Sequence, residues 1–140
     1  MGEILLAMKF EPLFDHVSEA RLAAQDICKK HYPQPGAEPL LSELLMAATE
    51  AMNNAVEHSG AKEVEIELIG EGRGLIFRVL TAGNRFDPPA DVAFPDLDGP
   101  DGLPEGGFGL AIISEMADSV QYDYRDGKNI VTLTKYISKN

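Results

Sequence analysis

Two long segments with helical periodicity follow one another in the first half of the chain. Apolar residues recur every three or four positions across residues 12–31 and again across residues 39–58, which is the spacing of one helix face. The loop at residues 31–39 contains three prolines and one glycine, and Gly60 follows the end of the second segment. The pattern therefore predicts two amphipathic helices before residue 61.

The other patterned segments predict strands. Residues 62–70 alternate apolar and acidic side chains, as a half-buried strand does, and residues 74–82 follow after a turn at Glu71-Gly72. Asp126-Gly127 predicts a hairpin between strands at 119–124 and 130–137. Residues 3–10 form a first strand and residues 109–117 a third helix. This order favours an α/β fold of the α+β two-layer sandwich type. We expect a mixed, largely antiparallel sheet with helices on one face, in a single domain over residues 1–140.

Composition limits the function classes. The 140 residues fit one domain, and 44% of them are hydrophobic, which is enough for a core. The formal net charge of -11 opposes binding to a phosphate backbone, so we expect no direct nucleic-acid contact. The single cysteine, Cys28, excludes an internal disulfide. No segment resembles a signal peptide or approaches the roughly 20 apolar residues of a membrane span, so we expect a cytoplasmic protein without membrane contact.

The second predicted helix has a polar face that contains two adjacent asparagines. At about 100° per residue its polar side chains fall on one side of the helix; they are Glu43, Glu50, Asn53, Asn54 and Glu57. A solvated helix face would explain the carboxylates, but asparagine is a poor helix former. Glu50 and Asn54 are four residues apart, so both can reach one bound object. A carboxylate and an amide oxygen suit Mg²⁺, or a carboxylate base beside it.

Two glycine-containing segments are further candidates for a site. Residues 106–110 (GGFGL) directly precede the third predicted helix, where backbone N–H groups can approach an anion. Residues 81–88 (TAGNRFDP) end a strand with a glycine turn and a Phe-Asp-Pro stop. Each segment alone is consistent with an ordinary loop, and neither is a P-loop or a G-x-G-x-x-G motif.

Taken together, three segments resemble one family. Residues 50–58 (EAMNNAVEH) resemble the N box of the GHKL ATPases, residues 81–88 the G1 box and residues 106–110 the G2 box. The Phe-Asp-Pro ending and the short chain resemble the anti-sigma-factor serine/threonine kinases of the RsbW and SpoIIAB type. The resemblance covers about residues 10–137 and implies the GHKL (Bergerat) ATPase fold.

The resemblance implies ATP and Mg²⁺ as cofactors and a role for each matching residue. Glu50 matches the general base that prepares a serine hydroxyl on a protein substrate, and Asn54 matches the Mg²⁺ ligand. Residues 89–106 match the ATP lid. The implied nucleotide-binding residues are Asn54, Thr81, Gly83, Phe86, Gly107, Gly109 and Leu110.

The same resemblance implies two protein partners. One is a STAS-domain anti-sigma-factor antagonist, which the kinase would phosphorylate on a serine. The other is a sigma factor, which a homodimer of the kinase would sequester, so that control of transcription would work by partner switching.

Two features depart from the family pattern. Thr81 stands where the G1 box has an adenine-binding aspartate, and no Lys or Arg occurs between Arg85 and Arg125. A non-catalytic GHKL-fold partner-binding regulator, with weak or no nucleotide binding, is therefore the alternative to the kinase. A sensor histidine kinase fragment is a third, weaker reading. It requires a phosphoacceptor histidine on a long upstream helical hairpin, and His16 is the sole candidate.

Overall fold

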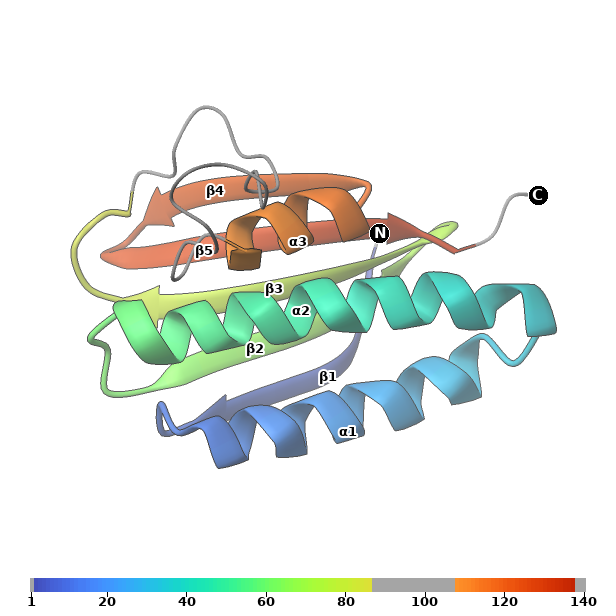
Figure 1. Cartoon of the computed structure of the whole chain (residues 1–140), viewed down its shortest axis with the longest axis horizontal. Coiled ribbons are helices and arrows are strands. Elements are labelled where there is room, and N and C mark those ends of the chain that lie inside the picture. The colour runs from blue at the N-terminus through green and yellow to red at the C-terminus, as the bar shows by residue number, and fades with distance from the viewer. Residues whose placement is uncertain (1, 87–107, 138–140) are drawn as a thin grey trace, which may run out of the picture.

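A computed structural model describes residues 2–86 and 108–137, which form a layer of helices over one sheet (Figure 1). The first half contains β1 (Glu3–Phe10), α1 (Phe14–His31), a 3-10 turn η1 (Pro35–Ala37) and α2 (Glu38–His58). The second half contains β2 (Val64–Glu71), β3 (Gly74–Ala82), α3 (Phe108–Met116), β4 (Ser119–Arg125) and β5 (Lys128–Tyr136). Both long helices and all five strands expected from the sequence are present.

The sheet has the strand order β1-β2-β3-β5-β4. Each of these pairings is antiparallel among the described strands. The three α-helices lie against the same face of the sheet, with α2 crossing in front of the central strands (Figure 1). The expected two-layer fold with helices on one face is therefore confirmed.

The core lies between the sheet and α1 and α2. Alternate residues of β3 point toward the helices, and Leu75, Phe77 and Val79 are buried there. The facing side of α2 supplies a continuous apolar stripe, which explains why this helix forms where its sequence periodicity predicts. Alanines at the contact between α1 and α2, such as Ala20 and Ala48, are fully covered and let the two helices approach closely.

One turn differs from the sequence expectation. Glu71 belongs to β2 and pairs with Gly74, so the turn consists of Gly72 and Arg73 rather than Glu71 and Gly72. Gly72 has a φ of 58°, which a glycine adopts without strain, and this fixes the turn one residue later. The Asp126-Gly127 turn is confirmed, with φ values of 54° and 77°. Strand β5 begins at Lys128, two residues earlier than expected, because a two-residue turn leads directly into the ladder.

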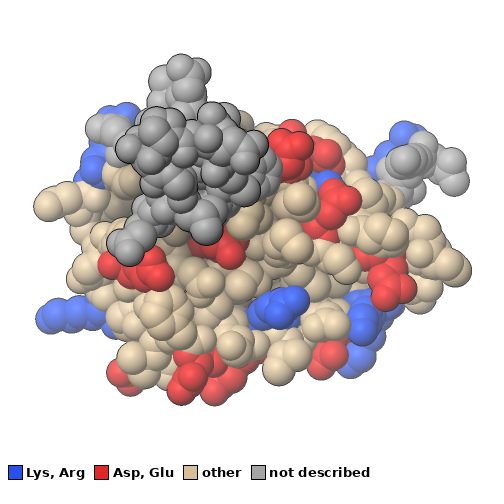
Figure 2. Space-filling model, in the orientation of Figure 1, with Lys and Arg blue, Asp and Glu red and all other residues tan. Residues whose placement is uncertain are grey.

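Charged side chains on the helix-bearing face are dispersed. Figure 2 shows that face, on which Lys and Arg are separated by acidic and uncharged residues and do not gather into one basic field among the described residues. No helix in the described part of the chain combines the length and the apolar character needed to cross a membrane.

Candidate functional site

Glu50 and Asn54 lie one turn apart on α2, and both face the first turn of α3. Both side chains are half-buried. Gly109, the second residue of α3, lies directly over them. A Cβ added to Gly109 would be 3.2 Å from Asn54 Oδ1 and 3.3 Å from Glu50 Oε2. Two of the three predicted boxes, from segments more than 50 residues apart in sequence, therefore meet at one place.

The local sequence explains why these side chains face α3. Apolar residues of α2 such as Leu44 and Met52 are buried against the sheet, so the residues between them turn toward the neighbouring helix. Helix α3 is held against α2 by buried Ala111 and Ile113. Glycine at position 109 permits this close approach, because any other side chain would crowd the two polar groups.

Glu50 has an altered proton affinity. Burial of its carboxyl group raises its pKa above the ordinary value of 4.5, and the negative charge of Glu57 raises it further. A carboxylate with a raised pKa is a better proton acceptor near neutral pH than an exposed glutamate. The environment of Glu50 is therefore suited to a general base.

Thr81 lies in the row of β3 residues that faces the helices. It is 7% exposed, and its neighbours across the sheet are Val64 in β2 and Asn129 in β5. Its hydroxyl makes no hydrogen bond to any described residue. Within the described part of the chain, this hydroxyl is therefore a donor and acceptor without a partner, on the helix-facing side near the C-terminal end of β3.

Gly83 and Phe86 follow β3 in a short loop. Gly83 has a φ of 152° and would bring a Cβ to 3.6 Å from the carbonyl oxygen of Ser59, which follows α2. The Phe86 ring is 47% exposed and lies 6.0 Å, centroid to centroid, from the Tyr122 ring. The third predicted box therefore lies beside the C-terminal end of the helix that carries Glu50 and Asn54.

The remaining residues singled out in the sequence differ in their exposure, and some lie outside the described residues. Leu110 is half-buried and packs against the core. Asn53 is half-buried and Glu57 is exposed, with a carboxylate oxygen 3.3 Å from His58 Nε2. Gly107 and residues 89–106 lie outside the described residues.

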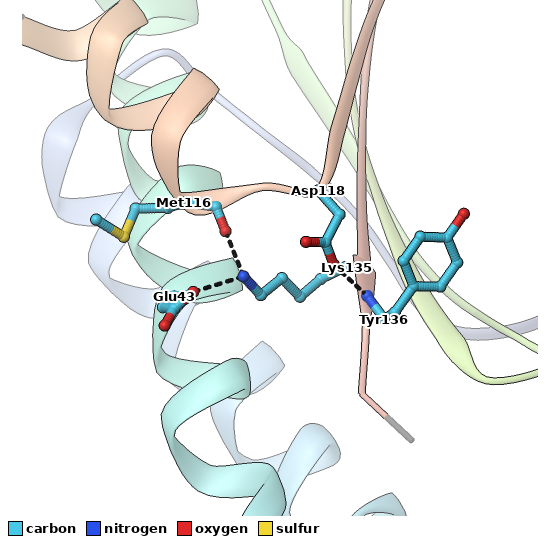
Figure 3. A network of polar contacts seen from close by, with 5 residues as sticks. All are labelled: Glu43, Met116, Asp118, Lys135 and Tyr136. Carbon is cyan, nitrogen blue, oxygen red and sulfur yellow. Dashed lines mark hydrogen bonds and ion pairs between the residues drawn. The ribbon is translucent and has the colours of Figure 1, made fainter. Parts of the chain in front are cut away.

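Glu43, which shares the polar face of α2 in the sequence, is engaged elsewhere (Figure 3). Lys135 of β5 reaches between the helices and donates to Glu43 Oε2 at 2.5 Å and to the Met116 carbonyl at 2.8 Å. Lys135 is 5% exposed, so this contact joins β5, α2 and the C-terminal end of α3 in the interior. Asp118 accepts a hydrogen bond from the Tyr136 amide at 2.8 Å beside it. Glu43 therefore serves the packing of α3 rather than the Glu50 and Asn54 pair.

Sequence reasoning missed the residues of the β4–β5 hairpin that contact the 83–86 loop. Tyr124 donates its hydroxyl hydrogen to the Gly83 carbonyl at 2.9 Å, and Asn129 bonds to backbone groups of Asn84 and Phe86. These contacts span more than 40 positions in the chain and follow from the pairing of β3 with β5. No local pattern marks them in the sequence.

The residues present fit a magnesium-nucleotide complex. Asn54 Oδ1 and Glu50 Oε2 offer the hard oxygen atoms that Mg²⁺ prefers, and they converge on one point. Gly109 lies against these two side chains in the first turn of α3, at the end of the helix where backbone N–H groups favour an anion. Among the described residues, Asn54 and Glu50 are thus the side chains that border the first turn of α3 at this point.

Comparisons with known proteins identify a family and a relative. The family model of the histidine kinase-like ATPase domain matches residues 10–135 of this chain. The chain is 28% identical over 97 residues to the serine/threonine-protein kinase BtrW of Bordetella bronchiseptica. That match covers 66% of this chain and 68% of BtrW.

Two solved structures share the fold. The RsbU and RsbW domains of Rv1364c from Mycobacterium tuberculosis superpose with a TM-score of 0.61 at 16% identity, over 96% of this chain and 33% of that one. The histidine kinase AdeS of Acinetobacter baumannii superposes with a TM-score of 0.56 at 16% identity, over 96% of this chain and 69% of that one. This chain thus spans about a third of the first of these structures.

Proposed function

Because this chain belongs to the histidine kinase-like ATPase domain family, we propose that it is an ATP-dependent serine/threonine kinase and anti-sigma factor. Its substrate would be a serine of a STAS-domain anti-sigma-factor antagonist. The observation that carries the proposal is the meeting of Glu50, Asn54 and Gly109 at one point. The relative named a serine/threonine-protein kinase supports the same reading.

The proposal gives each of these residues a role. Glu50 accepts the proton of the substrate serine hydroxyl while the serine oxygen attacks the terminal phosphorus of ATP and ADP leaves. The raised pKa of Glu50 favours this proton transfer. Asn54 holds Mg²⁺, which neutralises phosphate charge when bound. Gly109, together with Gly107, brings backbone N–H groups to the phosphates.

The base end of the nucleotide lies toward β3 in this proposal. Thr81 offers its unpaired hydroxyl to the adenine amino group, and Gly83 leaves room for the ring. Phe86 and Leu110 supply apolar surface at the rim of the site. The whole chain, residues 1–140, acts as one domain, and residues 89–106 serve as the lid over the nucleotide.

The proposed partners follow from the same family type. Phosphorylation of the antagonist releases it, and a homodimer of the unoccupied kinase then binds a sigma factor. Because sigma factors act on RNA polymerase, the proposal places the chain in the cytoplasm. It does not require contact of this chain with DNA.

A phosphotransfer assay tests the proposal. The purified chain is incubated with radiolabelled Mg-ATP and each STAS-domain protein of the same organism, and the products are mapped by mass spectrometry. We expect label on one serine of one STAS protein, and no label when that serine is replaced by alanine. Absence of label on every STAS protein, with Mg-ATP bound by the chain, would contradict the kinase assignment.

One observation favours a second candidate, a partner-binding regulator without catalysis. The inner end of β3 carries Thr81 with Val64 and Asn129 beside it, so none of these three side chains supplies a carboxylate for the adenine amino group. Such a chain would keep the fold and bind its partners without nucleotide. Co-purification of a sigma factor that is unchanged by Mg-ATP or Mg-ADP would support this candidate.

A further inference from the structure

The side-chain amide of Asn129 forms hydrogen bonds to two backbone groups of the loop that follows β3. Asn129 lies directly opposite Thr81 in the pairing of β3 with β5. Its Oδ1 accepts a hydrogen bond from the Phe86 amide at 2.7 Å, and its Nδ2 donates to the Asn84 carbonyl at 2.8 Å. Both distances are short for amide hydrogen bonds, and the two bonds use both ends of the side chain.

The same loop has two further ties to the β4–β5 hairpin. The Gly83 amide donates to the Gly127 carbonyl at 3.1 Å, and the Gly83 carbonyl accepts from the Tyr124 hydroxyl at 2.9 Å. Tyr122 adds its ring contact with Phe86. The hairpin therefore sets the path of the chain from Gly83 to Phe86.

This loop borders the proposed nucleotide site. Gly83 approaches the carbonyl of Ser59 directly after α2, and Asn54 lies on the last turns of that helix. A short exposed loop without these ties would sample many conformations, and ordering it on binding would weaken affinity. The contacts with the β4–β5 hairpin therefore hold the loop in one conformation before a ligand binds.

We propose that Asn129 is a positioning residue of the nucleotide site, which acts by holding residues 83–86 in the conformation that receives the base end of the nucleotide. Tyr124 acts on the same loop through its hydrogen bond to the Gly83 carbonyl. This inference rests on the proposed nucleotide-binding function. Neither side chain needs to touch the phosphates or the reacting serine.

The test is a calorimetric titration of the full chain with Mg-ATP. Asn129→Leu removes both side-chain bonds and should weaken Mg-ATP binding by about 10- to 30-fold, since each net hydrogen bond contributes roughly 1 kcal/mol. Asn129→Asp keeps the acceptor for Phe86 and loses the donor to Asn84, so its loss should be intermediate. Tyr124→Phe should weaken binding by about 5-fold.

Tyr136→Phe is the matched control. It removes a tyrosine hydroxyl from β5 at a side chain that is 59% exposed and far along the strand from Asn129, so binding should stay within about twofold of the wild type. Steady-state phosphotransfer gives a second readout. Asn129→Leu should raise KM for ATP and leave kcat within about threefold, because the lost ordering affects binding rather than the chemical step.

Amide hydrogen exchange tests, without any nucleotide, whether Asn129 holds residues 83–86 in place. The Phe86 amide should exchange faster in Asn129→Leu and keep its wild-type rate in Tyr124→Phe, which acts on Gly83 instead. If Asn129→Leu does not fold by circular dichroism, the calorimetric titrations of Asn129→Asp and Tyr124→Phe with Mg-ATP carry the test of the positioning role.

The outcomes separate this inference from the proposed function. Wild-type binding of Mg-ATP with unchanged affinity in Asn129→Leu and Tyr124→Phe overturns the positioning role and leaves the proposed function standing. Absence of Mg-ATP binding by the wild type overturns both.

Discussion

Gly109→Ala probes the contact on which the proposed site depends. The new Cβ would lie 3.2 Å from Asn54 Oδ1, 3.3 Å from Glu50 Oε2 and 3.4 Å from Asn54 Nδ2. The first two separations are a few tenths of an ångström tighter than an ordinary contact, so the two polar ends must rotate away. Displacing one such side chain from its rotamer costs about 0.5–1.5 kcal/mol.

Fold stability should change little in this variant. Crowding costs about 1–2 kcal/mol, and alanine regains up to about 1 kcal/mol of helix propensity over glycine. The net loss should therefore be roughly 0–2 kcal/mol, because the regained helix propensity offsets only part of the crowding at a helix end. Ligand affinity should change more, because Asn54 and Glu50 lose the geometry that Mg-ATP requires; we expect Mg-ATP binding to weaken about 10-fold or more.

The assay pairs thermal unfolding with calorimetric titration of Mg-ATP. Gly36→Ala is the control, because a Cβ there would meet nothing within 4 Å and Gly36 has no positive φ. It should leave binding unchanged. Equal Mg-ATP affinity in Gly109→Ala and the wild type, with both folded, would refute the assignment of this contact to the nucleotide site.

Three further predictions use other residues. Glu50→Gln should abolish phosphotransfer, while its Mg-ATP affinity stays within about tenfold of the wild type. In the wild type, kcat should fall on acidification, through a pKa above the ordinary glutamate value. Because that pKa is raised by folding, the ionised Glu50 costs stability near neutral pH. Thermal melts should therefore show Glu50→Gln to be the more stable at pH 7, with the difference vanishing below about pH 4. Thr81→Asp should tighten ATP binding about 5- to 30-fold and increase the preference of the protein for ATP over GTP. The free energy of unfolding without ligand should fall, because the new carboxylate is buried. Lys135→Met should lower the free energy of unfolding by about 1–3 kcal/mol in denaturant titrations, since it removes bonds to Glu43 and Met116; an unchanged midpoint would show that the bonds contribute nothing.

The sequence predicted most of the fold because its patterns are local. The apolar period of α2 and the alternation in β2 each identify an element from a few neighbouring residues. The turn at Gly72-Arg73 was missed by one residue, because the sequence does not show which residue closes the ladder with Gly74.

The candidate site was predicted only in part. Glu50 and Asn54 share a helix face at a spacing of four, so their proximity follows from the sequence alone. The same reasoning grouped Glu43 with them, and only the position of β5 shows that Lys135 engages it. The roles of Asn129 and Tyr124 depend on the crossover that places β5 beside β3, and that strand order is not encoded in any local pattern.

Calorimetric titration of the wild type and of Asn54→Ala with Mg-ATP tests the central claim most directly. Asn54→Ala removes the proposed cation ligand and the amide over which Gly109 lies, and alanine suits the interior of α2. We predict stoichiometric binding to the wild type and affinity at least about tenfold weaker in the folded variant. Absence of binding to the wild type, or equal affinity for both proteins, would contradict a nucleotide site built on Glu50, Asn54 and Gly109.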